Sequence, residues 1–320
     1  MAKYHLYFHD DFDGTASAVV FLDFFRKKGD KILSFNPINY TPNLKKNGQI
    51  LNLKCHLFWL ILCIIPKQLG GSITTKPLLL ILIGIKKYKD DETHVFNPSF
   101  KSGCGLVLAH LKKRYKYKVP KHIEYLVRWG DVIDSANYKS AKQIVERKES
   151  ALKLMSFLDS IDRRDPKAYQ TEISNIIKKL ITDSVDKFIN QSKIAKKIKE
   201  HLGGIKISIK KFKDVAVFTE GVVFVDGTKD EISGSHFLAY YLYPKSFYSV
   251  SISKYGGYYH ISVGSNPWNR VRAGYKINIG EVMTRYGGGG HRGIGATEKK
   301  SKKEIMKIAE EVIEYLNKHG

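Results

Sequence analysis

The sequence predicts an α/β protein of two domains, and three observations support this class. The chain has 320 residues, a length at which two domains are expected. An apolar run at 4–8, an acidic turn and an apolar-rich segment with helical spacing at 15–28 follow one another, in the strand–turn–helix order of an α/β sheet. From residue 205 the chain changes to short runs of β-branched and aromatic residues, which indicates a second, mixed sheet.

We therefore expect a parallel-sheet α/β domain at 1–200 and a smaller mixed-sheet α/β domain at 205–320. The first strand is expected at Tyr4–Phe8. Apolar periodicity predicts the helices of the first domain, at Thr15–Lys28, Gly103–Tyr115, Lys121–Trp129, Ala141–Ser160 and Glu172–Leu202. His201-Leu202-Gly203-Gly204 ends the last of these helices and is interpreted as the link between the domains.

The second domain is predicted to hold five strands and two helices. The strands are expected at Ile205–Ile209, Val215–Phe218, Val222–Val225, Tyr248–Ser253 and Tyr258–Val263. The helices are expected at Ser235–Tyr241 and Ser301–Asn317.

Acidic residues follow the first predicted strand, where open α/β sheets place their ligands. His9, Asp11 and Asp13 stand at alternate positions and offer one nitrogen and two hard oxygen ligands. That set suits Mn²⁺ or Mg²⁺. The alternative is an Asp-rich turn that caps the following helix.

A run of four glycines at 287–290 is the second unusual feature. Gly288, Gly289 and Gly290 permit close backbone approach to a ligand, and His291 and Arg292 follow with side-chain donors. Successive N–H groups in such a tract can form an anion-binding nest, which predicts phosphate binding. A flexible turn is the alternative.

Together these motifs resemble the DHH phosphoesterases, which include RecJ-like nucleases, nano-RNases and 3′-phosphoadenosine-phosphate phosphatases. H-x-D-x-D-G at 9–14 and G-G-G-G-H at 287–291 carry the resemblance. The segment Arg128–Ala136 is similar to the fourth motif of that family, and Phe96–Leu111 is similar to the helix start that precedes it. The resemblance covers the chain except for one window.

The resemblance implies an N-terminal metal domain, a C-terminal substrate domain and a two-metal phosphoesterase reaction. Asp131 joins His9, Asp11 and Asp13 as an implied metal ligand, with two Mn²⁺ ions as the implied cofactor and Mg²⁺ as the alternative. The implied substrate is a short oligonucleotide or a nucleotide phosphate. RNA, DNA, 3′-phosphoadenosine phosphate, a cyclic-dinucleotide product and polyphosphate all remain open, as does the oligomeric state.

The family's Asp-His-His motif is absent, and its expected place shortly before Phe96 has an unusual composition. No Asp or Glu occurs between Asp30 and Asp90, although the protein has 31 acidic residues. Two of the three cysteines fall there, with unpatterned apolar runs at 57–65 and 78–85 that are far shorter than the ~20 residues of a membrane span.

We interpret the window of about 44–85 as the product of a reading-frame shift. The codons of Leu69–Leu78 can be chosen so that the shifted frame reads W-W-F-D-H-H-K-T-T. Upstream, Trp59–Ile61 can encode a V-D pair that resembles the family's second motif. The frame would be lost between Asn43 and Lys54 and regained near Lys86. A sequencing error, a pseudogene lesion and a programmed shift all remain open, as does a genuine apolar insertion.

The net charge of +23 favours polyanionic partners, so nucleic acid is a candidate partner. A Lys-rich proteome with solvated charged faces is the alternative. Outside the aberrant window Cys104 is the only cysteine, which predicts no disulfide framework and a cytoplasmic location. Met1–Phe8 is too short for a signal peptide, and we expect no membrane attachment.

Several single residues have two interpretations. Many relatives carry an S-x-R-S element near Ser265, which this chain lacks, and Arg270 is a candidate substitute. Trp268 is expected either to stack on a base or to pack in the core. His236 and His260 are expected to be ordinary core or surface histidines. Asp134 is interpreted as a second acid behind the metal ligands or as a cap, and Asp10 as solvent-facing.

The predicted function is Mn²⁺-dependent hydrolysis of phosphodiester or phosphomonoester bonds. Because Asp-His-His is lost, the catalytic acid is unknown and the chain as written is expected to be inactive. The competing class is a catalytically dead relative that binds nucleic acid.

Overall fold

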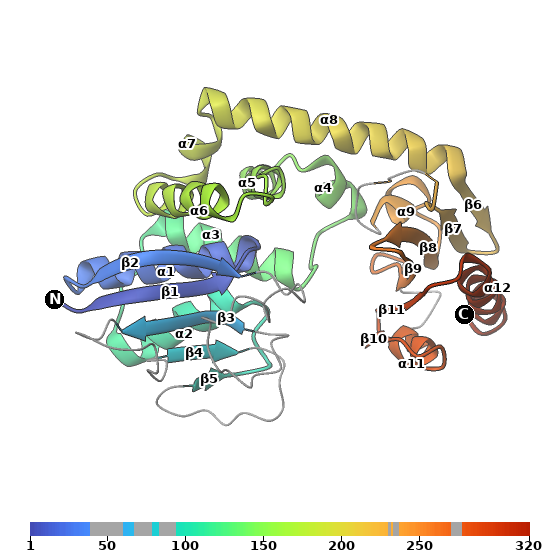
Figure 1. Cartoon of the computed structure of the whole chain (residues 1–320), viewed down its shortest axis with the longest axis horizontal. Helices are drawn as coiled ribbons and strands as arrows, with labels where there is room; N and C mark the ends of the chain where they lie inside the picture. Colours follow the sequence, from blue (N-terminus) through green and yellow to red (C-terminus); the bar gives the residue numbers. More distant parts are fainter. Residues whose placement is uncertain (39–59, 67–78, 83–93, 230–231, 233–236, 270–276) are drawn as a thin grey trace. The chain divides into compact units, whose positions relative to one another are not determined.

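The computed structural model describes residues 1–38, 60–66, 79–82, 94–229, 232, 237–269 and 277–320. These residues divide into two compact units (Figure 1). Unit 1 comprises Met1–Tyr138 and Glu149–Ile198, and unit 2 comprises Lys139–Lys148 and Lys199–Gly320. Most of the window at 44–85, including the predicted Asp-His-His position, lies outside the described residues. Within the described ranges, no helix combines the length and the apolar character that a bilayer span requires.

Unit 1 is built on a five-stranded sheet in the order β2-β1-β3-β4-β5. The strands are β1 Lys3–His9, β2 Lys31–Ile38, β3 Leu60–Pro66, β4 Leu79–Leu82 and β5 His94–Phe96. The α/β class is confirmed, but the sheet is mixed where we expected parallel strands throughout. β1 pairs with β2 and β4 pairs with β5 in parallel, whereas β3 runs antiparallel to both of its neighbours. β3 and β4 are the two strands inside the aberrant window.

Unit 1 contains the helices α1 Phe12–Lys27, α2 Gly103–Tyr115, α3 Lys121–Asp134, α5 Ser150–Asp159, α6 Pro166–Leu180 and α7 Val185–Ile189. Helices α2 and α3 begin at the predicted residues and α1 begins three residues before its predicted start, but two of the predicted helices are broken. The helix expected at 141–160 is interrupted, because Arg147 at the end of α4 (Ala141–Glu146) adopts a left-handed conformation at φ 48°. The helix expected at 172–202 is divided among α6, α7 and α8.

Helix α8 (Ser192–Val215) continues through the predicted link at Gly203-Gly204. The strand expected at 205–209 is therefore wrong. Apolar side chains recur at spacings of four and three residues, which is a helical stripe, at Ile198, Leu202, Ile205, Ile209 and Phe212. Ile198 and Phe212 are buried, whereas Ile207, on the opposite side, is 62% exposed. Burial of the stripe outweighs the cost of two glycines, about 1 kcal/mol each relative to alanine.

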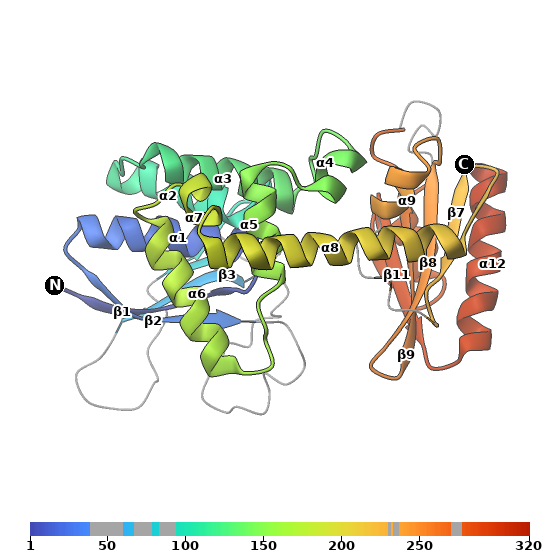
Figure 2. The same cartoon turned by 90° about the horizontal axis from the view of Figure 1, so that it is seen from above.

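Unit 2 has a six-stranded mixed sheet in the order β10-β11-β9-β8-β7-β6. The strands are β6 Ala216–Thr219, β7 Val222–Asp226, β8 Tyr248–Tyr255, β9 Tyr258–Ser265, β10 Gly289–His291 and β11 Ile294–Lys299. Besides α4 and most of α8, the described residues of unit 2 form helices α9 Phe237–Leu242, α11 Ile279–Thr284 and α12 Lys302–His319. In Figure 2, α12 runs alongside this sheet, and its residues Ile305, Val312 and Leu316 join the same core as Val250 and Ile261.

Candidate functional site

The β1–α1 turn places the acidic cluster at the C-terminal end of β1. Asp11 is the N-cap of α1, and its Oδ1 accepts a hydrogen bond from the Gly14 N–H at 2.7 Å. Its Oδ2 lies 2.5 Å from Nδ1 of His9. A Cβ at Gly14 would lie 2.0 Å from the His9 carbonyl oxygen, so only glycine permits this turn. The expected cap is therefore present, and it coexists with the pairing of His9 and Asp11.

Asp13 lies in the first turn of α1 and is only 4% exposed. Its two carboxylate oxygens accept hydrogen bonds from the backbone N–H groups of Gly103 at 2.9 Å and Cys104 at 2.8 Å. These N–H groups begin helix α2, where the helix dipole favours a negative charge. The Cys104 side chain also hydrogen-bonds the Asp13 carboxylate.

Asp131 reaches the same helix start from α3. The hydroxyl of Ser102, the N-cap of α2, donates to Asp131 Oδ1 at 2.5 Å and accepts from the Gly105 N–H at 3.0 Å. A Cβ at Gly105 would lie 2.6 Å from Asp131 Oδ1, and a Cβ at Gly130 would lie 2.3 Å from Sγ of Cys104. These glycines let α3 approach α2 closely enough to bring the carboxylates of Asp13 and Asp131 to one place.

The charges of this cluster act on one another. Burial, together with the charge of Asp11, raises the pKa of Asp13 to about 6. Lost hydration and the charges of Asp13, Asp11 and Asp131 raise the pKa of Asp134 to about 7, although this residue is exposed. Burial lowers the pKa of His9, but its hydrogen bond and charge interaction with Asp11 outweigh that effect and leave the pKa raised. Asp134 thus interacts electrostatically with the acidic cluster, and its role there stays a prediction.

The structure brings the four predicted ligands into one neighbourhood. In the described ranges, however, no three His, Cys, Asp or Glu side chains are already arranged around a single ion position. The donor set still fits a hard divalent cation, because carboxylate oxygens predominate and they repel one another without a cation between them. Metal binding therefore stays a prediction.

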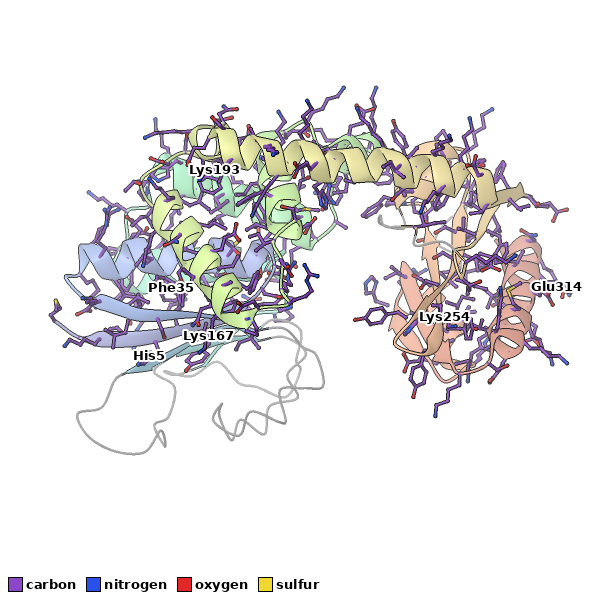
Figure 3. All side chains as sticks on the ribbon, turned by 45° about the horizontal axis from the view of Figure 1, so that its top comes forward. His5, Phe35, Lys167, Lys193, Lys254 and Glu314 are labelled. Carbon is purple, nitrogen blue, oxygen red and sulfur yellow. The ribbon has the colours of Figure 1, made fainter. Side chains whose placement is uncertain are left out.

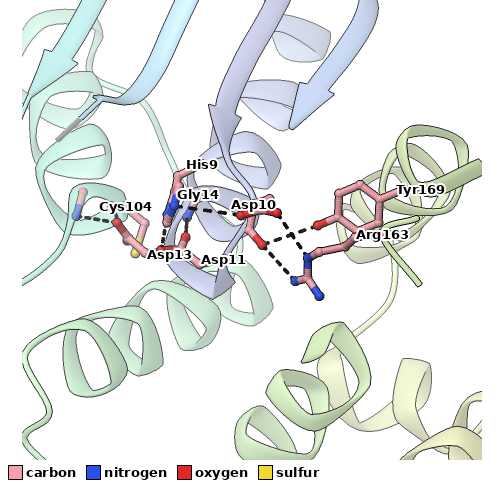
Figure 4. A network of polar contacts seen from close by, with 9 residues as sticks. His9, Asp10, Asp11, Asp13, Gly14, Cys104, Arg163 and Tyr169 are labelled. Atoms are coloured by element: carbon pink, nitrogen blue, oxygen red, sulfur yellow. Dashed lines mark hydrogen bonds and ion pairs between the residues drawn. The ribbon is translucent and has the colours of Figure 1, made fainter. Parts of the chain in front are cut away.

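Asp10 is not solvent-facing, contrary to our expectation. Its side chain is 9% exposed, and its Oδ2 accepts a hydrogen bond from Nε of Arg163 at 3.2 Å. The Asp10 carbonyl oxygen accepts from Nη2 of Arg163 at 3.3 Å and from the hydroxyl of Tyr169 at 3.4 Å. Figure 4 shows these contacts on one side of the turn and the Asp13–Cys104 contact on the other. The sequence offered no signal for this pairing, since Arg163 is 153 residues away.

The glycine tract of unit 2 forms the edge of a hairpin and not an open loop. β10 pairs antiparallel with β11, and the N–H groups of Gly287 and Gly288 donate to the carbonyls of Thr284 and Met283 at 3.1 and 3.0 Å. Those two donors are therefore not available to a nest. The side chains of His291 and Arg292 are exposed beside them.

Close packing explains most of these glycines. A Cβ at Gly288 would lie 2.1 Å from the Ala296 carbonyl oxygen, and one at Gly290 would lie 2.2 Å from that of Ile294. Gly287 has a φ of 76°. Gly289 differs, because a Cβ there would meet no atom within 4 Å. Substrate binding at Gly288–Arg292 stays a prediction.

An open depression of about 580 Å³ lies elsewhere on unit 2, and its lining includes Glu220, Glu310 and Glu314 together with Lys318. Three carboxylates against one ammonium group disfavour a phosphate there. Trp268 packs near the rings of Phe237 and Tyr240 at 5.5 and 6.4 Å, in agreement with the packing alternative. Arg270 and His236 lie outside the described residues, and His260 is a half-buried residue 3.4 Å from Glu298.

No protein-family model matches the chain, and no curated protein matches it. Its fold is similar over 99% of its length to the whole solved structure of a pGpG-specific phosphodiesterase, PggH from Vibrio cholerae. The TM-score is 0.70 and the sequence identity 17%. An exopolyphosphatase-related protein from Bacteroides fragilis shows a weaker likeness, with a TM-score of 0.39 and 17% identity over 74% of this chain and 64% of that chain.

Proposed function

We propose that the chain is a divalent-metal-dependent phosphoesterase scaffold whose substrates are short oligonucleotides or nucleotide phosphates. The observation that carries the proposal is the convergence of Asp13 and Asp131 on the first turn of α2. Asp11 interacts electrostatically with Asp13, and His9 and Asp131 interact electrostatically with Asp134. Such a cluster is costly for folding alone, since like charges at close range oppose one another.

In this proposal Asp11, Asp13, Asp131 and His9 would hold two Mn²⁺ ions, with Mg²⁺ as the alternative. When bound, such ions would supply an activated water nucleophile and would offset charge on the leaving oxygen. The contribution of α2 is to keep the Asp13 and Asp131 carboxylates in place through Gly103, Cys104 and Ser102. Asp134 adds a further carboxylate whose charge interacts with those of Asp13, Asp11 and Asp131.

The chain as written lacks Asp-His-His and with it the histidine that protonates the leaving group in the family it resembles. We therefore propose that this polypeptide does not turn over substrate. The chain translated after single-base corrections at both borders of the window, here called the restored chain, should contain the motif and be active.

The proposed substrate contact lies at Gly289, His291 and Arg292 of unit 2. Gly289 leaves open space above its backbone, and the two exposed side chains offer donors to a phosphate. The similarity to a phosphodiesterase described as pGpG-specific makes a dinucleotide a reasonable first substrate to assay.

A catalytically dead nucleic-acid-binding protein is the second candidate, and the lysines of α8 favour it. Helical spacing places the exposed Lys199, Lys206, Lys210 and Lys213 along one flank of the helix, beside the apolar stripe. Among the described ion pairs, none involves these four lysines. Figure 3 shows the described side chains, including the exposed Lys193 at the start of this helix. A row of unpaired cations suits a phosphate backbone.

Hydrolysis assays on the two forms of the chain separate these candidates. The restored chain and the chain as written are each incubated with pGpG, 3′-phosphoadenosine phosphate and a five-nucleotide RNA, with Mn²⁺ or with a chelator. The enzyme proposal expects Mn²⁺-dependent release of product by the restored chain alone. Salt-sensitive RNA binding without hydrolysis by either form would favour the binding protein instead.

A further inference from the structure

The turn between the predicted ligands His9 and Asp11 is held at Asp10 from two directions. The Asp10 N–H donates to the Ile38 carbonyl of β2 at 3.2 Å. Its carbonyl and its carboxylate both face Arg163, which belongs to the segment between α5 and α6. The backbone N–H, the backbone carbonyl and the Oδ2 of Asp10 therefore each have a partner outside the turn.

Arg163 is suited to this contact by its shape. Its Nε bonds the Asp10 carboxylate while its Nη2 bonds the Asp10 carbonyl, so one planar group fixes both the side chain and the backbone. Nη1 bonds the Ile161 carbonyl at 3.4 Å, and the guanidinium carbon lies 5.2 Å from the centre of the Tyr169 ring. The guanidinium is thus itself held in position.

The pairing also limits a contact between Asp10 and His9. Asp10 Oδ1 is 3.9 Å from Nε2 of His9, whereas Asp11 Oδ2 is 2.5 Å from Nδ1 of the same ring. A released Asp10 could close on Nε2, the ring nitrogen that Asp11 does not contact, and so compete with a metal ion there.

We propose that Arg163 is a positioning residue, which fixes the His9–Asp11 turn for metal binding by holding Asp10 out of the ligand set. The inference rests on the proposed metal site. It does not require Arg163 to touch metal or substrate.

The direction in which Mn²⁺ affinity changes on substitution of Arg163 separates a positioning role from a simple charge effect. Removal of the Arg163 charge leaves the acidic cluster more negative, so electrostatics alone would strengthen Mn²⁺ binding by Arg163→Gln. Loss of positioning weakens it. Arg163→Lys keeps the charge but offers only a compact ammonium group, so charge alone predicts unchanged binding and positioning predicts weaker binding.

The test is Mn²⁺ binding to the full chain as written, measured by electron paramagnetic resonance, which needs no catalytic activity. We expect both Arg163→Gln and Arg163→Lys to bind Mn²⁺ at least about tenfold more weakly, from loss of charge-assisted bonds. The matched controls are Arg164→Gln and Arg164→Lys. Arg164 is the adjacent arginine and pairs with the exposed Asp162, and we expect its variants to bind like the unsubstituted chain.

The outcomes distinguish this inference from the proposal on which it rests. If the unsubstituted chain binds no Mn²⁺, the metal site itself is wrong and the inference falls with it. If that chain binds Mn²⁺ but Arg163→Gln binds it equally or more tightly, only the inference is overturned. In the restored chain, Arg163→Lys should lower kcat with little change in KM, and a rise in KM alone would instead indicate substrate contact and contradict positioning.

Discussion

The Ser102 hydroxyl donates a hydrogen bond to the Asp131 carboxylate at 2.5 Å, across 29 residues of sequence. The same hydroxyl caps α2, whose first N–H groups bind Asp13. One helix start therefore organises both carboxylates, and its integrity should govern metal binding as well as stability.

Substitution Ser102→Ala should reduce both properties. Loss of the cap should lower the free energy of unfolding by about 0.5–2 kcal/mol, and release of Asp131 should weaken Mn²⁺ binding. The control is Ser184→Ala. The Ser184 side chain caps α7 by accepting a hydrogen bond from the Lys187 N–H, so this substitution removes a helix cap without changing a contact of the acidic cluster. Urea unfolding and Mn²⁺ titration of both variants check this prediction. If Ser102→Ala and Ser184→Ala bind Mn²⁺ with equal affinity, Ser102 does not position Asp131 for metal binding.

A buried hydrogen bond between Tyr117 and Asp23 of α1 should make the free energy of unfolding depend on pH. The Tyr117 hydroxyl donates to Asp23 Oδ2 at 2.7 Å, and the Asp23 side chain is fully buried. Burial raises the pKa of Asp23, but hydrogen bonds from Lys27 and Tyr117 outweigh burial and leave it lowered. The stabilisation is therefore complete above the unfolded pKa of about 3.9 and is lost as the pH falls through the lower folded value.

Substitution Tyr117→Phe should accordingly cost about 1–3 kcal/mol of unfolding free energy at pH 7, and the deficit should shrink below about pH 4. Tyr115→Phe is the control, because Tyr115 is 45% exposed. Unfolding curves of the restored chain at several pH values measure both. A deficit of constant size across that range would show that Asp23 is not the partner that matters.

The glycine tract allows substrate binding to be tested without disturbing the fold. Gly289→Val adds a side chain into open space and should block approach of a phosphate, whereas Gly288→Val would collide with the Ala296 carbonyl and unfold the hairpin. Arg292→Ala should raise KM at least about tenfold, since charge-assisted contacts are worth on the order of 1.5–3 kcal/mol.

Calorimetry of the restored chain with Ca²⁺, in place of a catalytic metal, measures binding of a two- to five-nucleotide RNA and of 3′-phosphoadenosine phosphate. Arg285→Ala removes another exposed guanidinium of unit 2 and serves as the control. Unchanged affinity in both Gly289→Val and Arg292→Ala would mean that the tract serves only the packing of the hairpin.

The reading-frame interpretation is tested at the level of DNA. Resequencing should reveal compensating insertions or deletions near codons 43–54 and 84–87, or a corrected read that encodes Asp-His-His. A confirmed gene whose shifted frame lacks GAY CAY CAY across codons 72–75 would disprove it.

Local patterns predicted much of this protein, and long-range contacts account for what they missed. The strand, turn and helix around His9–Gly14 follow from residue order, and α2 has the bounds expected for it. The course of α8 was missed because Gly203-Gly204 suggested an end, although the apolar spacing continued to Phe212. The partner of Asp10 could not be predicted, because only the folded chain brings Arg163 to it.

The central claim is that the carboxylates gathered at α2 support metal-dependent phosphoester hydrolysis. The most direct measurement is the Mn²⁺-dependent turnover of pGpG by the restored chain with Asp11→Ala or Asp13→Ala, beside Asp162→Ala as an exposed-carboxylate control. We predict that the first two variants keep the circular dichroism spectrum of the folded protein. Their kcat should fall at least about a hundredfold, which is more than substitution of residues that only hold the metal ligands in place usually causes. We predict that the control retains full activity. Near-normal turnover by both Asp11→Ala and Asp13→Ala would contradict the account.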